Sequence, residues 1–272
     1  MNNPKHVVCY SGGHSSALVA IEVSRKFGTD GLVLLNHDIN SSVEAADIKR
    51  FKTEVADYIG VPITYANHAH WDTKDQFDVV IDAKAFKVRN GTALCTHRLK
   101  TQPFERWLKA HDPEKKSTIY YGFDASETVR IQRRVGILAS MGYRSDYPLA
   151  FWERTILSTS HIGIEPPNTY GLFKHANCTG CLKASKQHWY LVFLHRKDIW
   201  EKAKRAEEVI GYTIMKEQPL EELEAIYEEM QAAGLETTEH EDPRTFFARV
   251  RKALNEWKVV EDFEPKPCEC FV

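Results

Sequence analysis

Through about residue 150, short apolar runs alternate with longer amphipathic stretches, and this alternation constrains the fold more than any other feature. Apolar runs bounded by Gly, Asn or Pro predict buried strands, and apolar residues at helical spacing predict the helices between them. The expected strands are 7–10, 31–35, 62–66, 119–123 and 147–151, and the expected helices are 15–27 and 43–59. Strands separated by helices predict a mostly parallel sheet with helices on both faces.

The pattern changes from about Glu153. Residues 158–174 are rich in Ser, Thr, Gly and Pro and predict a long loop. Three helices are expected after it, at 186–208, 220–233 and 244–257, the last with Asp242 as N-cap and Pro243 in its first turn. The fold class is therefore expected to be α/β, a doubly wound, Rossmann-like sheet with a helical C-terminal extension. We expect one unit over 1–155 and a second, packed on it, over 156–272.

Composition excludes several classes of protein. With 272 residues, 43% of them hydrophobic, the chain can bury a sizeable core. No apolar run approaches the roughly 18 residues of a membrane helix, and the first residues lack the apolar stretch of a signal peptide. A cytoplasmic protein without a membrane partner is therefore expected. The net charge of -2 provides no global positive field for nucleic acid, although Arg130, Arg133 and Arg134 leave a local basic patch open.

A glycine-rich loop, Ser11-Gly12-Gly13-His14-Ser15-Ser16, lies between the first expected strand and helix. Two glycines allow close backbone approach to a phosphate, and the helix N-terminus behind them presents free N–H groups. The loop therefore predicts a phosphate or pyrophosphate site, and a plain strand-to-helix turn is the alternative. Asp38 follows the second expected strand, where ligands bind in such sheets, and is a candidate contact for ribose or adenine. A solvated turn is the alternative for Asp38.

The cysteines carry the second signal. Six cysteines in a chain of this length do not indicate a disulfide scaffold, and in a reducing cytosol clustered cysteines more often bind metal or serve catalysis. Cys178-Thr179-Gly180-Cys181 is a Cys-x-x-Cys pair that fits zinc, a redox disulfide or an iron–sulfur cluster. Cys9, inside the first strand, is expected to be a core residue.

The glycine-rich loop resembles that of the PP-loop superfamily, Ser-Gly-Gly-x-Asp-Ser, with Ser15 in place of the Asp. It lacks the Gly-Lys-Ser/Thr ending of Walker loops. Residues 89–104 resemble a segment of the phosphoadenylyl-sulfate (PAPS) reductase family, in which a Cys or Cys-Cys precedes a Lys and then Pro-Leu before a helix. Cys95, Lys100 and Pro103-Phe104 take those places. The resemblance covers about residues 6–195.

The resemblance implies an adenine nucleotide, such as ATP with or without Mg²⁺, on residues 11–16 and Asp38. It also implies a [4Fe-4S] cluster on Cys95, Cys178 and Cys181. Where cluster-bearing adenylyl-sulfate reductases have Cys-Cys, this chain has Cys95-Thr96, so one iron is left open or filled by another group. That ligand count is chemically similar to the three-cysteine clusters of ATP-dependent transfer-RNA thiolation enzymes in the same superfamily.

Three further candidates depend on the resemblance. Residues 122–130 resemble the family's Gly-x-Arg-x-x-Gln/Glu-Ser-x-x-Arg, so Arg130 is a candidate partner for phosphate or sulfate. The alternative is helix capping by Ser126 with solvated charges. Lys100 is a candidate to serve the nucleotide or the electrostatics of the cluster. The tail Cys268-Glu269-Cys270 resembles the start of the reductases' Glu-Cys-Gly-x-His ending. Cys270 and Cys268 are therefore candidate nucleophiles or a fourth cluster ligand, and a non-catalytic tail is the alternative.

Three functions remain open. The first is an ATP-dependent iron–sulfur sulfurtransferase that activates its substrate by adenylation, with a nucleobase in RNA, a DNA phosphate or a small molecule as substrate. The second is a sulfonucleotide reductase that uses a tail cysteine. The third is a nucleotide-sensing module with a structural metal. The partners implied are an adenine nucleotide and a sulfur donor or thiol reductant, and a homodimer is an open alternative.

Overall fold

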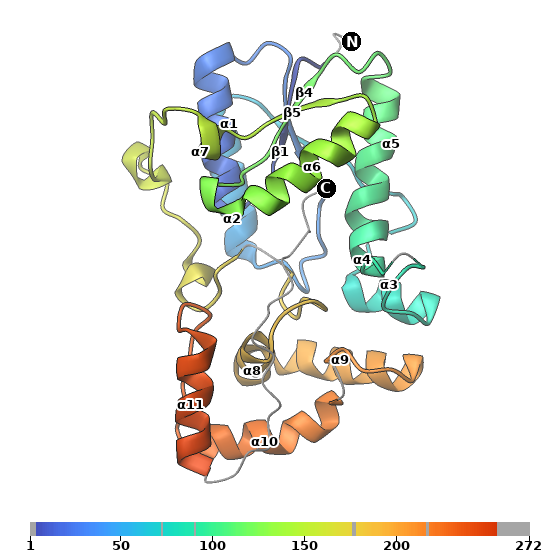
Figure 1. The fold of residues 1–272 in the computed structure, drawn as a ribbon, viewed down its shortest axis with the longest axis vertical. Coiled ribbons are helices and arrows are strands. Elements are labelled where there is room, and N and C mark those ends of the chain that lie inside the picture. The colour runs from blue at the N-terminus through green and yellow to red at the C-terminus, as the bar shows by residue number, and fades with distance from the viewer. Residues whose placement is uncertain (1–3, 72, 90, 176–177, 216–217, 255–272) are drawn as a thin grey trace.

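Five parallel strands form one sheet in the order β3-β2-β1-β4-β5 (Figure 1). The structure, a computed structural model, describes residues 4–71, 73–89, 91–175, 178–215 and 218–254. The strands are β1 (His6–Cys9), β2 (Leu32–Asn36), β3 (Ile63–Tyr65), β4 (Thr118–Tyr120) and β5 (Arg144–Asp146). The central strand β1 pairs His6 with Leu32 on one side and with Thr118 on the other. The expected α/β class is confirmed.

Both faces of the sheet are covered because successive strand residues point to opposite sides. Val8 of β1 packs toward α1 (His14–Phe27) and α2 (Ala46–Ile59). Val7 and Cys9 pack on the other face, toward α5 (Gln102–His111) and α6 (Thr128–Ser140), which follows the short 3₁₀ turn η2 (Ala125–Glu127). The chain reverses its direction of winding between β1 and β4, so their carboxyl ends form a switch point where such sheets bind ligands.

The crossover from β3 to β4 contains helices that the apolar pattern did not predict. They are α3 (Gln76–Ala83), α4 (Leu94–Thr96) and a π-helical turn, η1 (His97–Thr101), which leads into α5. A capping box starts α3, because the Asp75 carboxylate accepts the N–H groups of Phe77 and Asp78 while Asp78 accepts the N–H of Asp75. A helix this short gives little periodicity to detect.

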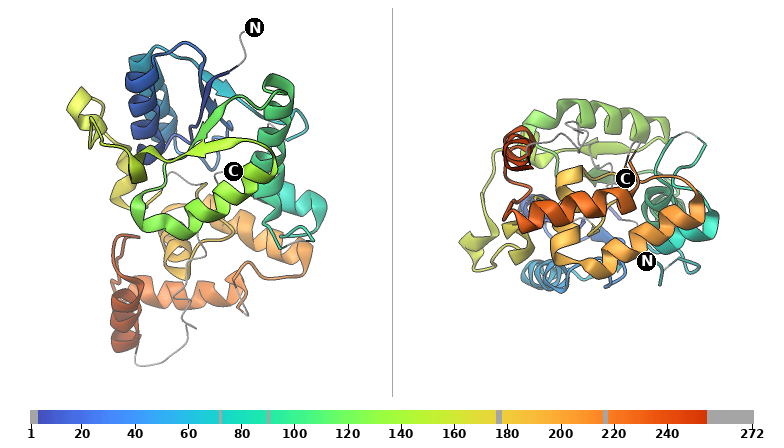
Figure 2. Two further views of the ribbon diagram at one scale, coloured as in Figure 1. Left: turned by 45° about the horizontal axis from the view of Figure 1, so that its top comes forward. Right: turned by 90° about the horizontal axis from the view of Figure 1, so that it is seen from below.

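The C-terminal helices lie beyond the carboxyl edge of the sheet (Figures 1 and 2). After the 3₁₀ turns η3 (Thr159–Ile162) and η4 (Asn168–Gly171) come α8 (Lys186–His195), α9 (Lys197–Ile210), α10 (Leu220–Ala232) and α11 (Pro243–Leu254). Their buried aromatic side chains share one core with Phe77 and Val80 of α3, so this core draws on both expected units. No helix of the described residues is long and apolar enough to cross a membrane.

Two expectations are corrected. The single helix expected over 186–208 is two helices, because Arg196 has φ -140° and ψ 65°, outside the helical region. The strand expected over 147–151 lies earlier, at Arg144–Asp146, and residues 148–151 form the short helix α7 (Pro148–Phe151). Pro148 has no N–H for a sheet and suits the first turn of a helix.

The start of α11 confirms the expected N-cap. The helix begins at Pro243, and the N–H of Thr245 donates to Oδ1 of Asp242 at 3.1 Å. The expected end at residue 257 lies outside the described residues.

Candidate functional site

The glycine loop, residues 11–16, forms a tight turn between β1 and α1. Gly12 has φ +83°, and a Cβ there would lie 3.1 Å from Cδ of Lys52, so a side chain would be strained and crowded. The hydroxyl of Ser16 donates to the carbonyl of Gly13 at 2.8 Å and lies 2.9 Å from the hydroxyl of Ser11. These contacts hold the loop at the positive end of the α1 dipole.

A buried ion pair lies next to the glycine loop and supports it. Nζ of Lys52 lies 3.0 Å from the carboxylate of Glu44, and both side chains are almost fully buried. Lys52 also donates to Oδ1 of Asn36 at 3.3 Å, while the Asn36 amide donates to the carbonyl of Tyr10, at the carboxyl end of β1. The loop therefore lies on a charged, hydrogen-bonded network that links β1, β2 and α2.

A large cavity of about 640 Å³ opens beside the glycine loop, within the size range of sites for cofactors. One wall is the glycine loop with Gly122 and Phe123, which follow β4. A Cβ on Gly122 would lie only 3.0 Å from the carbonyl carbon of Ser15, so the two loops pack closely. The opposite wall comes from the C-terminal part of the chain and includes Tyr170, Phe173, Cys181, Lys183, His188 and Glu239.

Five of the six loop residues predicted for the nucleotide line this cavity, namely Ser11, Gly13, His14, Ser15 and Ser16. The N–H of His14 is already bonded to the hydroxyl of Tyr170, 2.9 Å away. The C-terminal part of the chain therefore contacts the loop directly.

A second, small cavity brings the three cysteines of the sequence prediction together. Its lining combines Cys95 of α4 with the Cys-x-x-Cys segment and is made of Gln76, Cys95, Thr96, Leu99, Lys100, Cys178, Cys181, Leu182 and Lys183. All three cysteines are free thiols. Burial, reinforced by the neighbouring thiols, raises the pKa of Cys95 to about 12. We call this space the cysteine cavity.

The cysteine cavity also contains polar groups without protein partners. Oγ1 of Thr96 and Oε1 of Gln76 are buried and have no hydrogen-bond partner in the described part of the chain. Buried polar atoms of this kind are groups that a bound ligand or water could satisfy. Across the described ranges, no group of three or more His, Cys, Asp or Glu side chains is arranged to hold a single metal ion. In a cubane cluster each thiolate binds a different iron, so its ligands stand farther apart than those of one ion.

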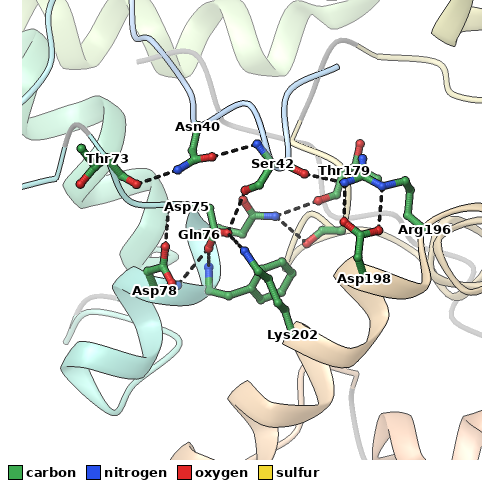
Figure 3. A network of polar contacts seen from close by, with 12 residues as sticks. Asn40, Ser42, Thr73, Asp75, Gln76, Asp78, Thr179, Arg196, Asp198 and Lys202 are labelled. Carbon is green, nitrogen blue, oxygen red and sulfur yellow. Dashed lines mark hydrogen bonds and ion pairs between the residues drawn. The ribbon is translucent and has the colours of Figure 1, made fainter. Parts of the chain in front are cut away.

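The turn Cys178–Cys181, which we call the cysteine turn, is held by two separate segments of the chain. The side-chain amide of Gln76 donates to the carbonyls of Thr179 (2.8 Å) and Gly180 (3.3 Å). The N–H of Thr179 donates to the carbonyl of Val43 at 2.9 Å. Around Gln76, Asp75 joins α3 to Lys202 of α9, 2.7 Å away (Figure 3). Gln76 and Val43 thus hold the turn against the N-terminal half of the chain, and Asp75 joins the same region to α9.

The other predicted residues have mixed placements. Arg130 lines the large cavity, forms an ion pair with Glu127 and lies 4.3 Å from the ring centre of Phe123. The cap of the turn before α6 is Asp124, which accepts the N–H of Ser126, so the alternative in which Ser126 caps the helix is wrong.

Lys100, on η1, lines the cysteine cavity, and the residues that line the large cavity do not include it. Asp38 is likewise absent from that lining and accepts a hydrogen bond from Lys49 at 2.8 Å. Cys268 and Cys270 lie outside the described residues.

Sequence reasoning missed several residues of the site. Lys183 lines both cavities. It follows Cys181 by two positions, so its proximity to the Cys-x-x-Cys pair in the sequence could have identified it as a site residue. Gln76, His188 and Glu239 are brought to the site only by tertiary packing. No local motif could have selected them.

Comparison with known proteins finds a similarity to a phage protein. No protein-family model matches the chain, and no solved structure matches it. The chain is similar to the "Uncharacterized nin region protein ORF290" of Escherichia phage lambda, with 27% identity over 207 residues, which is 67% of each chain. That description states no activity.

Proposed function

We propose that this chain is a PP-loop enzyme of sulfur chemistry in the PAPS reductase family, and specifically an ATP-dependent iron–sulfur sulfurtransferase. The supporting observation is that Cys181 lines both the large cavity and the cysteine cavity. A nucleotide on the glycine loop and a group held by the three cysteines would therefore share one wall. A site that only bound a nucleotide would not require this proximity.

The glycine loop would hold the phosphates of ATP. Ser15, at the N-terminus of α1 with its positive dipole end, lines the same cavity as Arg130. Attack of a substrate oxygen on the α-phosphorus would give an adenylated substrate and release pyrophosphate. A sulfur nucleophile would then displace AMP, and the carbon or phosphorus atom of the substrate would exchange oxygen for sulfur.

Cys95, Cys178 and Cys181 would hold the iron–sulfur cluster. When bound, a three-thiolate cluster supplies an iron that no cysteine occupies and that is available to a sulfur ligand. Burial raises the pKa of Cys178, and the positive charge of Lys100, which lines the cysteine cavity, opposes that rise and would partly balance the charge of the thiolates.

A sulfonucleotide reductase is the second candidate. Cys95 and Lys100 lie on consecutive turns and line one cavity with the Cys-x-x-Cys pair, as the linear layout of the reductases implies. This candidate needs Cys270 or Cys268 as the nucleophile that attacks the sulfonyl sulfur.

Anaerobic purification followed by iron and sulfide analysis tests the proposal. We expect about four irons per chain in the wild type, and loss of iron in Cys95→Ala and Cys178→Ala. Cys9→Ala is the matched control, since Cys9 is buried but does not line the cysteine cavity. Zinc in place of iron, or no metal, would exclude both sulfur mechanisms.

Two assays then separate the candidates. A sulfurtransferase releases pyrophosphate from ATP in the presence of its acceptor, whereas a reductase releases sulfite from a sulfonucleotide. Replacing Cys268 and Cys270 together should abolish only the second activity. Gly122→Ala should weaken ATP binding because its Cβ would press on Ser15, whereas Gly136→Ala, with open space around it, should not.

A further inference from the structure

Lys183 lies where the two cavities meet. It lines the large cavity together with the glycine loop, and it also lines the cysteine cavity beside Cys95 and Cys178. Cys181 shares this double placement. The short segment from Cys181 to Lys183 is therefore the partition between the nucleotide side and the thiol side of the site.

The charge of Lys183 is not balanced by a carboxylate. Within the described ranges, its ammonium forms no hydrogen bond or ion pair. Arg130 lines the large cavity with Lys183, and Lys100 lines the cysteine cavity with it, so the partition lies among three cationic side chains. Cations that face one another in a half-buried site are unfavourable unless an anion binds between them.

The carboxylates on the wall of the large cavity are already bonded. Glu127 pairs with Arg130, and Glu239 lies 2.6 Å from Nδ1 of His188 and also accepts the N–H of Lys174 at 2.7 Å. The partition thus carries a positive charge toward the cavity without a nearby acidic side chain that is free to neutralise it.

We propose that Lys183, with Arg130, forms an anion subsite for a phosphoryl or sulfonyl group of the bound nucleotide. The inference rests on the proposed nucleotide site and adds to it a residue that contacts the reacting group. An ammonium on a flexible stem donates charge-assisted hydrogen bonds to non-bridging oxygens. The glycine loop would hold one end of the polyphosphate while Lys183 draws the reacting group toward the cysteines.

Equilibrium binding of three probes tests the subsite. ATP and adenylyl sulfate carry the two candidate anionic groups, and adenosine carries neither. We expect Lys183→Met to weaken binding of the anionic nucleotides by about tenfold to a hundredfold, and to change adenosine binding by less than about twofold. Lys183→Arg should restore most of the affinity. Lys109→Met, at an exposed position on α5 remote from both cavity linings, is the matched control.

The pattern across the probes identifies the group. Weakening of ATP alone indicates a phosphoryl group, weakening of adenylyl sulfate alone indicates a sulfonyl group, and weakening of both indicates their shared oxygens. Unchanged affinity in Lys183→Met, or an equal loss for adenosine, overturns the subsite while the nucleotide site stands. If the wild type binds neither nucleotide, the proposed function and the subsite both fail. A thermal melt of each variant shows that the protein remains folded.

Discussion

The backbone N–H of Gly180 donates a hydrogen bond to Nε2 of His188, 3.2 Å away. The other ring nitrogen, Nδ1, lies 2.6 Å from Oε1 of Glu239. An ionised carboxylate has no proton to donate, so Glu239 is the acceptor of this hydrogen bond. The proton of the neutral imidazole is therefore assigned to Nδ1, and Nε2 is the acceptor. His188 thus joins Glu239 to the cysteine turn.

Replacing His188 with Leu should loosen the cysteine turn. The change leaves the Gly180 N–H without its acceptor and Oε1 of Glu239 without its donor, so we expect the free energy of unfolding to fall by about 2 kcal/mol. Cys181 should also be alkylated faster in the metal-free protein. His195→Leu, at the end of the same helix, is the control. Equal effects of the two variants would contradict the positioning role of His188.

Gly180→Ala should be far more costly than Gly60→Ala. Gly60 has φ +77° and Gly180 has φ +72°. Both variants therefore bear the strain of a left-handed backbone, roughly 1 kcal/mol. A Cβ on Gly180 would also lie 2.5 Å from Cγ2 of Ile199, whereas Gly60 has open space around it. We expect an additional loss of about 2 kcal/mol for Gly180→Ala in chemical denaturation. Similar losses for both variants would show that Ile199 moves aside easily.

The buried pair of Lys52 and Glu44 gives a double-mutant test. Lys52→Met removes the nearer of the two lysines paired with the buried carboxylate of Glu44 and leaves Lys49 at 3.6 Å, so we expect a loss of about 3 kcal/mol in the free energy of unfolding. Adding Glu44→Gln should recover part of that loss, because no buried charge is then left alone. A double variant less stable than Lys52→Met would mean that the pair is not the main support of the glycine loop.

His37 should make the protein less stable in weak acid. Burial lowers the pKa of His37 to about 4, against 6.5 when unfolded, because the protonated ring is poorly solvated beside Lys100. The unfolded chain therefore takes up the proton first as pH falls. The contribution of neutral His37 to the free energy of unfolding is fully present above about pH 6.5. It is lost as the pH drops toward 4, and the loss amounts to about 2 kcal/mol.

Unfolding followed at several pH values measures this loss. His37→Gln keeps a donor for the carbonyl of Ala66, 2.6 Å from Nδ1, but does not titrate. Its stability should change less between pH 6.5 and 4 than that of the wild type. Parallel curves for the two proteins would assign the acid sensitivity to other groups.

The sheet and its loops could be predicted because their signals are local. Each strand from β1 to β4 is an apolar run, and the glycine loop follows directly from Gly12 and Gly13 between a strand and a helix. β5 was misplaced because its residues, Arg144 to Asp146, are polar and pair on one side only, with β4. An edge strand of that kind has no apolar pattern to read.

The cysteine constellation could be predicted only in part. Cys178 and Cys181 form a recognisable pair, and the resemblance pointed to Cys95, which lines the same cavity. The contacts that hold the turn could not be foreseen. Gln76 is more than a hundred positions from Gly180 in the sequence, and the two meet only in the folded chain. The residues around Gln76 form no motif that would mark it as a contact of the turn.

The contacts that hold the cysteine turn in place have a consequence for biosynthesis. Val43 and Gln76 leave the ribosome early, whereas His188 and Glu239 emerge only after the turn itself has been made. During translation the three thiols are therefore exposed for the time needed to add the C-terminal helices, and oxidation or mismetallation threatens them most in that interval. Any cofactor that they hold together would be inserted late, because all five strands are synthesised before Cys178 and Cys181.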